Sequence, residues 1–485
     1  MPIQIKVVST AAGIRNAYTR MPFRFGVITM RAAPMLTLAV EIEDGSGCRA
    51  TGYAADFLAF RWFDKRPDRS LADNCADLLR TVEVATLRYL EAGREGWATP
   101  FDLWRTTYPE IERTALAAGF NRLGASFGAS MLERAVIDAV GRLSAQTLFE
   151  LVEGDALGIE LAAISPELRG RRLREVLPAR PLERLHVRHT VGLIDPITAA
   201  DVAVPVADGL PETLEDYLDH DGIGYLKVKV AGSLAGDIAR LERIAAVLER
   251  RARPVRISLD GNEQYRSLDD FLALIEQIRA SPKLRRLYEQ IMFIEQPLDR
   301  AAAMDPAIEP ALRALNRVKP VIIDEADGWV SAFKEAILLG YRGTSHKNCK
   351  GVYKSLHNLA LAAAHNERVG RAELFLSAED LSNLPVVPLQ ADLAAVALLG
   401  IDHVERNGHH YFRGLGHLSE AEKTAALTAH PDLYERRADE VFLKITGGML
   451  RCGSLQVPGM GFATPPELSA MTPVEDWEFA SLGQD

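Results

Sequence analysis

The sequence predicts an α/β protein whose largest part is a TIM-type (β/α) barrel. From about residue 185, short apolar runs alternate with amphipathic segments, and eight such runs can be counted. Eight strands with helices between most of them are what a (β/α) barrel requires. The residues before this point do not alternate in this way, and their pattern predicts an α+β block.

The opening block begins with strands and continues with helices. Runs rich in apolar and β-branched residues predict strands at 3–10, 25–30 and 35–47, the last of which ends in a Gly-rich turn. Helices are predicted at 72–93 and 129–153, because apolar residues such as Leu132 and Val136 recur at helical spacing in the second segment.

The strands and helices of the barrel follow in order. The predicted strands are 185–191, 225–230, 255–260, 291–295, 319–324, 341–347, 372–377 and 396–404. The predicted helices are 237–250, 268–280, 307–317, 331–339, 352–366 and 418–429. An open, doubly wound sheet is the alternative, but the first strand lacks the Gly-rich phosphate-binding turn of such folds.

Composition and charge exclude several classes of protein. The 56 basic and 66 acidic residues give a net charge of −10, which argues against a nucleic-acid partner. No apolar run approaches the ~18 residues of a membrane span, and the first residues do not resemble a signal peptide. The four cysteines form no CxxC pair and fit a reducing compartment. We expect a cytoplasmic protein that forms a homo-oligomer and has neither nucleic acid nor membrane as a partner.

Charged residues lie on five consecutive predicted strands, at the ends where catalytic groups of a barrel project. In chain order they are Lys227, Lys229, Asp260, Glu295, Asp324 and Lys347. Three converging carboxylates would repel one another, and a hard divalent cation removes this conflict. An all-oxygen site with open positions suits Mg²⁺. The sequence therefore predicts one Mg²⁺ held by Asp260, Glu295 and Asp324.

The two lysines of the second strand are candidates for catalysis. Lys227 and Lys229 are two residues apart, so both side chains point to the same face of the strand. Inside a barrel, repulsion and burial would lower a lysine pKa from ~10.4 toward the ~7–8 that suits a general base. A solvated lysine pair on an edge strand is the alternative. However, a barrel has no edge and helices cover its outer face, so we expect both side chains to point inward.

Five motifs in this order resemble the enolase superfamily, and within it the muconate-lactonizing-enzyme-like subgroup of the mandelate racemase/muconate lactonizing enzyme family. They are KVK (227–229), LDGNEQY (259–265), IEQP (294–297), IIDEA (322–326) and HK (346–347). The resemblance implies a capping domain at 1–180, a barrel at 181–430 with its active site at the strand C-terminal ends, and a C-terminal segment at 431–485. That last segment would pack on the capping domain and complete it.

The resemblance also implies a reaction. A Mg²⁺-dependent enzyme of this family removes the proton α to a carboxylate of a small substrate, through a metal-stabilised enediolate. Lys229 and Lys347 would act on opposite faces of the substrate, Lys227 would attract its carboxylate, and Asn262 and Glu325 would orient ligands. The outcome would be racemisation or epimerisation, cycloisomerisation, or elimination. The alternatives are an acid-sugar dehydratase of the same superfamily and a catalytically silent metal-binding barrel.

The residue of the sixth strand that faces inward is open at this point. The family usually has a Gly–Gly pair after this lysine, whereas this chain has only Gly351, one position early. His346 is therefore an alternative to Lys347 as the inward residue. The seventh strand carries no histidine, so the His–Asp base pair of mandelate-racemase-like members is not predicted.

Substrate choice in the family comes from two loops of the capping domain, here 20–26 and 52–65. Arg20 and Arg24 are candidates for binding a distal anionic group, and Glu379 at the end of the seventh strand is a candidate substrate contact. The neighbouring Asp380 would either touch substrate as well or cap the following segment. The aromatic residues of the second loop would form either an apolar lid or part of the core. They are Phe57, Phe60, Trp62 and Phe63.

Overall fold

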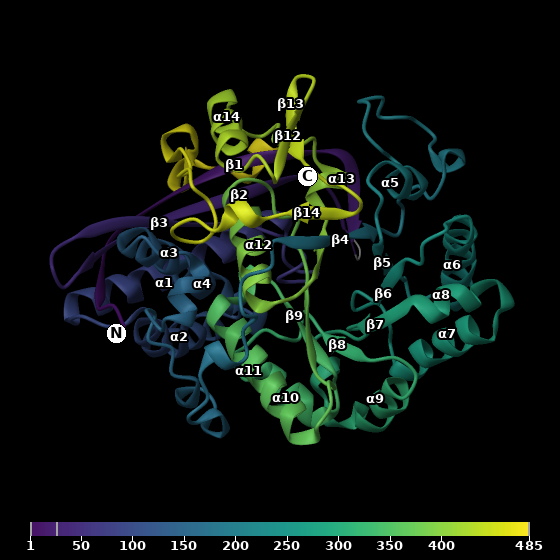
Figure 1. Cartoon of the computed structure of the whole chain (residues 1–485), viewed down its shortest axis with the longest axis horizontal. Coiled ribbons are helices and arrows are strands. Elements are labelled where there is room, and N and C mark those ends of the chain that lie inside the picture. The colour runs from purple at the N-terminus through teal and green to yellow at the C-terminus, as the bar shows by residue number, and fades with distance from the viewer. Residues whose placement is uncertain (1, 26–27, 484–485) are drawn as a thin grey trace.

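A computed structural model describes residues 2–25 and 28–483 of the chain. Gly26 and Val27, which belong to the predicted strand at 25–30, lie outside the described residues, and Gly26 is also the last residue of the first predicted specificity loop. The chain contains an antiparallel sheet with helices and a curled parallel sheet surrounded by helices (Figure 1). No helix in the described ranges is long and apolar enough to cross a membrane.

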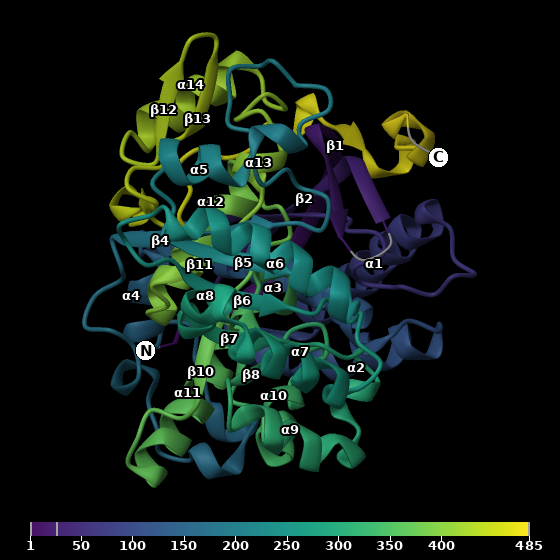
Figure 2. The same cartoon turned by 90° about the vertical axis from the view of Figure 1, so that its right-hand side faces the viewer.

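The antiparallel sheet has four strands in the order β15-β1-β2-β3. Its strands are β1 (Ile5–Phe25), β2 (Ile28–Asp44), β3 (Arg49–Phe57) and β15 (Thr472–Pro473). The sequence interpretation did not assign β3, which pairs with β2 along its whole length. Ile14 of β1 pairs with Thr472, so the C-terminal part of the chain lies beside the first strand, as both views show (Figures 1 and 2).

Helices pack on this sheet. They are α1 (Leu71–Glu95), α2 (Pro100–Ala117), α3 (Arg122–Ser144) and α4 (Leu148–Glu153). Each begins at a side chain that caps the first turn, as Ser70 does for α1. The predicted helix at 129–153 is two helices, because Ala145 adopts a left-handed conformation between them. The structure adds α2, which contains Pro109 and was not predicted. Gly52 of β3 contacts the backbone of α3 so closely that any side chain there would clash.

Eight parallel strands form the second sheet, and their order follows the chain from β4 to β10. They are β4 (Arg184–Val191), β5 (Tyr225–Lys229), β6 (Arg256–Asp260), β7 (Ile291–Glu295), β8 (Val321–Ile323), β9 (Gly343–His346), β10 (Phe375–Ala378) and β11 (His403–Arg406). The last strand, β11, pairs in parallel with the first, β4. This sequential order excludes the doubly wound alternative, in which the order of strands reverses.

Helices connect the parallel strands and cover the outside of the curled sheet (Figure 2). They are α5 (Leu214–His220), α6 (Leu234–Glu249), α7 (Leu268–Ala280), α8 (Arg285–Gln290), α9 (Glu309–Asn316), α10 (Ala332–Leu339), α11 (Val352–Val369) and α12 (Val387–Leu399). The predicted strand at 396–404 was partly wrong, since residues 396–399 end α12. Gly400 ends that helix in a left-handed conformation, and a short apolar run does not distinguish a buried helix end from a strand.

The remaining elements follow β11. They are α13 (Gly408–Tyr411), α14 (Glu420–Ala429), β12 (Tyr434–Arg437), β13 (Glu440–Leu443) and β14 (Met449–Arg451). β12 and β13 form a hairpin, and β14 pairs antiparallel with the beginning of β4. The C-terminal part of the chain therefore contacts both sheets. The domain boundaries drawn from the sequence stay a prediction.

Candidate active site

A cavity lies between the carboxyl ends of the parallel strands and the antiparallel sheet. Charged and polar side chains of the parallel strands and their loops line one part, including Lys229, Lys347, Asn262 and Glu325. Apolar side chains from β1, β2 and the segment that follows β3 line the other part. Parallel strands bring their C-terminal ends to one edge, and this places residues far apart in sequence around one space.

The Lys227 ammonium lies at the centre of a buried group of carboxylates. Its Nζ lies 2.7 Å from Glu295, 2.8 Å from Glu379, 3.0 Å from Glu405 and 3.1 Å from Asp260. Burial acts to lower the pKa of Lys227, but these carboxylates outweigh it and hold the pKa well above its ordinary value. The predicted lowering of the pKa is therefore wrong for Lys227, which remains a cation.

Lys229 and Asp260 form the next pair toward the cavity. Lys229 donates a short hydrogen bond to Asp260 Oδ2, and the backbone N–H of Asn262 donates to Oδ1 over 2.6 Å. Burial acts to raise the pKa of Asp260, but Lys227 and Lys229 hold it below its usual range. Asn262, which has a left-handed backbone conformation, also donates to Glu325 over 3.4 Å. The two residues predicted to orient ligands thus contact each other at the edge of the cavity.

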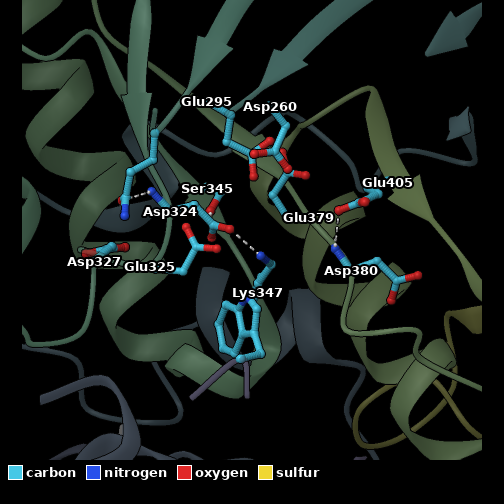
Figure 3. Close-up of polar contacts among 12 residues, drawn as sticks. Asp260, Glu295, Asp324, Glu325, Asp327, Ser345, Lys347, Glu379, Asp380 and Glu405 are labelled. Atoms are coloured by element: carbon cyan, nitrogen blue, oxygen red, sulfur yellow. Dashed lines mark hydrogen bonds and ion pairs between the residues drawn. The ribbon is translucent and has the colours of Figure 1, made fainter. Parts of the chain in front are cut away.

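Asp324 is bound by two lysines. Lys347 Nζ lies 2.5 Å from its Oδ2 and Lys350 Nζ 2.7 Å from its Oδ1, and Ser345 also donates to Oδ1. Burial alone would raise the pKa of Asp324, but Lys347 and Lys350 hold it well below its usual value. Figure 3 shows the Lys347 ammonium facing this carboxylate, while Asp260, Glu295 and Glu379 gather on the other side. The pKa of Lys347 lies above its ordinary value, because the carboxylate of Asp324 outweighs the effect of burial.

The structure shows which of Lys347 and His346 faces the cavity. Lys347 lines the cavity, and its Nζ lies 4.6 Å from the centre of the Trp62 ring. His346 is buried away from the cavity, with Nδ1 2.7 Å from Ser355 and Nε2 3.6 Å from Asp392. The local backbone requires a glycine at position 351. Its φ is +99°, and a Cβ at this position would lie 2.8 Å from a carboxylate oxygen of Glu133.

Asp260, Glu295 and Asp324 are the carboxylates predicted to bind Mg²⁺. Their donor atoms are all oxygens, and Glu295 Oε2 is buried with no hydrogen-bond partner among the described residues. Burial, together with Asp260 and Glu379, raises the pKa of Glu295 well above its ordinary value, although Lys227 acts to lower it. As placed, however, no three acidic, histidine or cysteine side chains in the described ranges surround one ion position. The donor set therefore fits Mg²⁺ in its chemistry, while the lysines hold Asp260 and Asp324 in ion pairs.

Three of the four candidate substrate contacts lie elsewhere. Arg20 is buried in an ion pair with Asp208, with Nε 2.6 Å from Oδ2, and it also donates to the backbone of Pro211 and His410. Arg24 is exposed. Glu379 is fully buried between Lys227 and Arg188, beneath the cavity. The structure therefore brings none of the three to the described lining of the cavity.

The structure adds site residues that the sequence did not assign. Glu405 of β11 lines the cavity and accepts from Lys227, and Lys350 binds Asp324. Arg188 of β4 pairs with Glu379 inside the sheet. Alternation along β4 and β11 was the available signal, because charged residues on covered strands point inward. Asp380, unlike these residues, is a candidate substrate contact from the sequence. It lines the cavity, and burial raises its pKa to about 7.

The aromatic residues of the predicted second loop both line the cavity and belong to the apolar core. Phe57, Phe60 and Trp62 line the cavity, and each is also buried in the main apolar core. Arg300, in the segment after β7, donates to the backbone oxygens of Trp62 over 2.8 Å and Phe63 over 2.9 Å. Its guanidinium also pairs with Glu263. A buried ion pair of the parallel sheet therefore holds the segment that covers the cavity.

Comparisons with solved structures identify the fold. A mandelate racemase/muconate lactonizing protein from Herpetosiphon aurantiacus superposes with a TM-score of 0.58 at 18% identity, covering 94% of this chain and 98% of that chain. Muconate lactonizing enzyme from Pseudomonas fluorescens gives 0.58 at 16% identity, covering 96% and 98%. Dipeptide epimerase from Enterococcus faecalis, complexed with Mg and a dipeptide, gives 0.57 at 15% identity, covering 94% and 99%.

Comparisons of the amino-acid sequence give no match of this kind. No protein-family model matches the chain, and no curated protein matches it. The structural likeness extends over nearly the whole length of each chain, so this chain has the fold of these enolase-superfamily enzymes.

Proposed function

We propose that this chain is an enolase-superfamily enzyme of the mandelate racemase/muconate lactonizing group, which removes the proton α to a substrate carboxylate. The observation that carries the proposal is the position of Lys229 and Lys347. They come from separate strands, line one cavity, and each contacts a different carboxylate of the predicted metal-binding set. The fold shared with racemases, epimerases and cycloisomerases supports this class of reaction.

The proposed architecture is a closed TIM-type barrel with a capping domain. The pairing of β11 with β4 supports closure of the barrel. The segments after β10 and β11 also contact each other, because the backbone N–H of Asn407 donates to the Asp380 carboxylate over 2.7 Å. The pairing of β1 with β15 supports a cap to which both ends of the chain contribute. The expected homo-oligomer and cytoplasmic location stay predictions.

The proposed metal site consists of Asp260, Glu295 and Asp324, with Mg²⁺ as the ion. Their oxygen donors and the unpartnered Glu295 Oε2 support this assignment. When bound, the ion supplies positive charge that favours ionisation next to a carboxylate. Asn262 and Glu325 would hold the orientation of the site from its edge.

The lysines have distinct roles in this proposal. One of Lys229 and Lys347 would accept the α-proton as a neutral amine, after losing its own proton to solvent, and the other would return a proton to the opposite face as an ammonium. Each would first give up its carboxylate contact. Lys227 remains an ammonium because four carboxylates surround it. Its positive charge would stabilise the negative charge that develops on the substrate carboxylate. Two opposed lysines favour racemisation or epimerisation, whereas one lysine as base permits cycloisomerisation or elimination. No histidine is among the described lining residues, so no observation favours the dehydratase alternative.

Exchange of the α-proton in D₂O tests the proposal. The full-length protein with Mg²⁺ should exchange the α-proton of an accepted carboxylate, and nuclear magnetic resonance detects the loss of the proton signal. The double variant Lys229→Met/Lys347→Met should show no exchange although it still folds. Exchange at the wild-type rate in this variant would contradict the proposal, and a folded wild type that exchanges no carboxylate would favour the silent barrel.

A further inference from the structure

We infer that the substrate of this cavity is a monocarboxylate whose remaining part is apolar, such as an aryl or branched alkyl group. The inference rests on the proposed function, since it concerns the same site. It follows from the division of the cavity into a charged wall and an apolar wall, and from the absence of a distal cation among the described lining residues.

The apolar wall comes from the antiparallel sheet and the segment that follows it. Phe23, Met30, Phe57, Phe60 and Trp62 all line the cavity. Most of these rings are fixed by a second aromatic partner outside the lining. Phe23 stacks on Tyr411 at 4.1 Å between ring centres, Phe57 on Phe412 at 5.8 Å, and Phe60 meets the edge of Phe479 at 6.1 Å. Rings packed in this way cannot turn aside to expose polar groups.

Among the described lining residues, every lysine of the charged wall already contacts a carboxylate, so the wall offers no separate cation for a second anionic group. Its lysines all contact the carboxylates of the proposed metal site, and its remaining side includes Asp380 and Glu405. Arg20, which could bind a second anion, is held by Asp208. A second carboxylate on the substrate would therefore face either apolar rings or acidic side chains, and both are unfavourable.

Hydroxyl groups would be poorly matched on the apolar wall, since the polar lining residues Asn262, Ser382 and Asn407 come from the loops of the parallel sheet on the other side. A polyhydroxylated chain along the apolar wall would lose its hydrogen bonds to water and gain no partner from the rings or from Met30. An aryl or branched alkyl group loses nothing in this position and removes apolar surface from water. The cavity thus favours an apolar substituent over the substituents of dicarboxylates and sugar acids.

Three carboxylates that each have a hydroxyl group on the α-carbon, and differ in the rest of the molecule, test this inference. They are 3-phenyllactate with a benzyl group, malate with a second carboxylate, and gluconate with a polyhydroxylated chain. Calorimetric titration of the full-length protein with excess Mg²⁺ should show that phenyllactate binds at least about a hundredfold more tightly than the other two. Equal or tighter binding of malate or gluconate would overturn the inference, and so would the absence of binding by all three.

A matched pair of variants on β2 locates the preference. Met30 lines this cavity, whereas Met35, on the same strand and similarly buried, does not. Met30→Gln should weaken phenyllactate binding about tenfold and leave malate binding unchanged, while Met35→Gln should change neither. Melting curves of both variants show whether they are equally folded. An equal loss in both variants would mean that the effect is structural and would contradict the assigned wall.

Failure of the inference and failure of the proposed function give different results. Tight binding of phenyllactate with no α-deuterium incorporation would support the apolar substrate class and contradict proton abstraction. Deuterium incorporation into gluconate or malate but not phenyllactate would support proton abstraction and overturn the substrate class.

Discussion

The guanidinium of Arg300 donates a 2.8 Å hydrogen bond to the backbone oxygen of Trp62, and the Trp62 ring lies 4.6 Å from the Lys347 ammonium. A residue in the segment after β7 thus positions a side chain that lies next to a candidate base. Glu263 pairs with Arg300 in turn, so a buried ion pair between two loops of the parallel sheet helps to hold the segment around Trp62 in place.

Replacing Arg300 should loosen this segment. In Arg300→Ala, the segment around Trp62 loses its charge-assisted hydrogen bonds, and we expect catalytic efficiency to fall at least about tenfold. Steady-state kinetics and quenching of Trp62 fluorescence by acrylamide would measure the loss and the loosening together. Arg266→Ala, at an exposed arginine, is the control and should change neither quantity. Unchanged quenching in Arg300→Ala would show that Arg300 does not position Trp62.

Lys227 should matter for folding as well as for catalysis. Removing its ammonium in Lys227→Met leaves several buried carboxylates facing one another, so we expect a loss of about 3–5 kcal/mol in the free energy of unfolding. Urea denaturation measures this loss. Lys334→Met, which breaks an exposed pair with Glu167, should cost less than about 1 kcal/mol. A Lys227→Met protein as stable as wild type would contradict the ion-pair centre.

The two candidate bases should act on different faces of the substrate. Lys229→Ala and Lys347→Ala should each stop turnover, yet each remaining lysine should still exchange the α-proton of one stereoisomer. Deuterium incorporation into separate pure enantiomers distinguishes the two variants. Full exchange of both isomers by Lys347→Ala would refute the two-base mechanism and leave Lys229 as the sole base.

Glu295 should control metal binding. Glu295→Gln retains the size of the side chain but removes its ability to ionise and bind a cation through the buried, unpartnered oxygen. We expect Mg²⁺ affinity, measured by calorimetry without substrate, to fall by at least about tenfold. Glu276→Gln, at an exposed glutamate of α7, should bind Mg²⁺ like wild type. Equal affinity in the Glu295 and Glu276 variants would place the ion elsewhere.

Glu133 should make the stability of the protein depend on pH. Burial raises its pKa from the ordinary 4.5 to about 7, although it accepts a 2.7 Å hydrogen bond from the backbone of Tyr353. The folded state therefore holds this proton more tightly than the unfolded state, and the contribution of Glu133 to stability falls as the pH rises from 4.5 to about 7. The loss reaches about 3 kcal/mol and then stays constant.

The variant Glu133→Gln does not ionise, so its stability relative to wild type should increase over the same pH range and not beyond it. Urea denaturation at a series of pH values measures the difference. Glu83→Gln, at an exposed glutamate of α1, should show no such trend. A Glu133→Gln protein whose relative stability does not change with pH would contradict the raised pKa.

The sequence by itself determined which residues stand at the ends of the parallel strands. Lys229, Asn262, Glu325 and Lys347 line one cavity, because alternation sets which side chains point inward and parallel strands end at one edge. The alternation of strands and helices likewise indicated the parallel strands from about residue 185 onward. Such reasoning was weaker for segments without a clear period, such as β3 and α2, where packing on neighbouring elements decides the conformation.

Only the tertiary structure decided which charges meet. Lys227 contacts Glu379 and Glu405, which are 152 and 178 residues away in the chain, because the curled sheet brings its last strands beside its second. Arg20 contacts Asp208, 188 residues away, and not the cavity. Strand patterns fix the face on which a side chain lies, but its partner depends on how the sheet curls and how the antiparallel sheet packs over it. That arrangement raises the pKa of Lys227 where the spacing alone predicted a lower one.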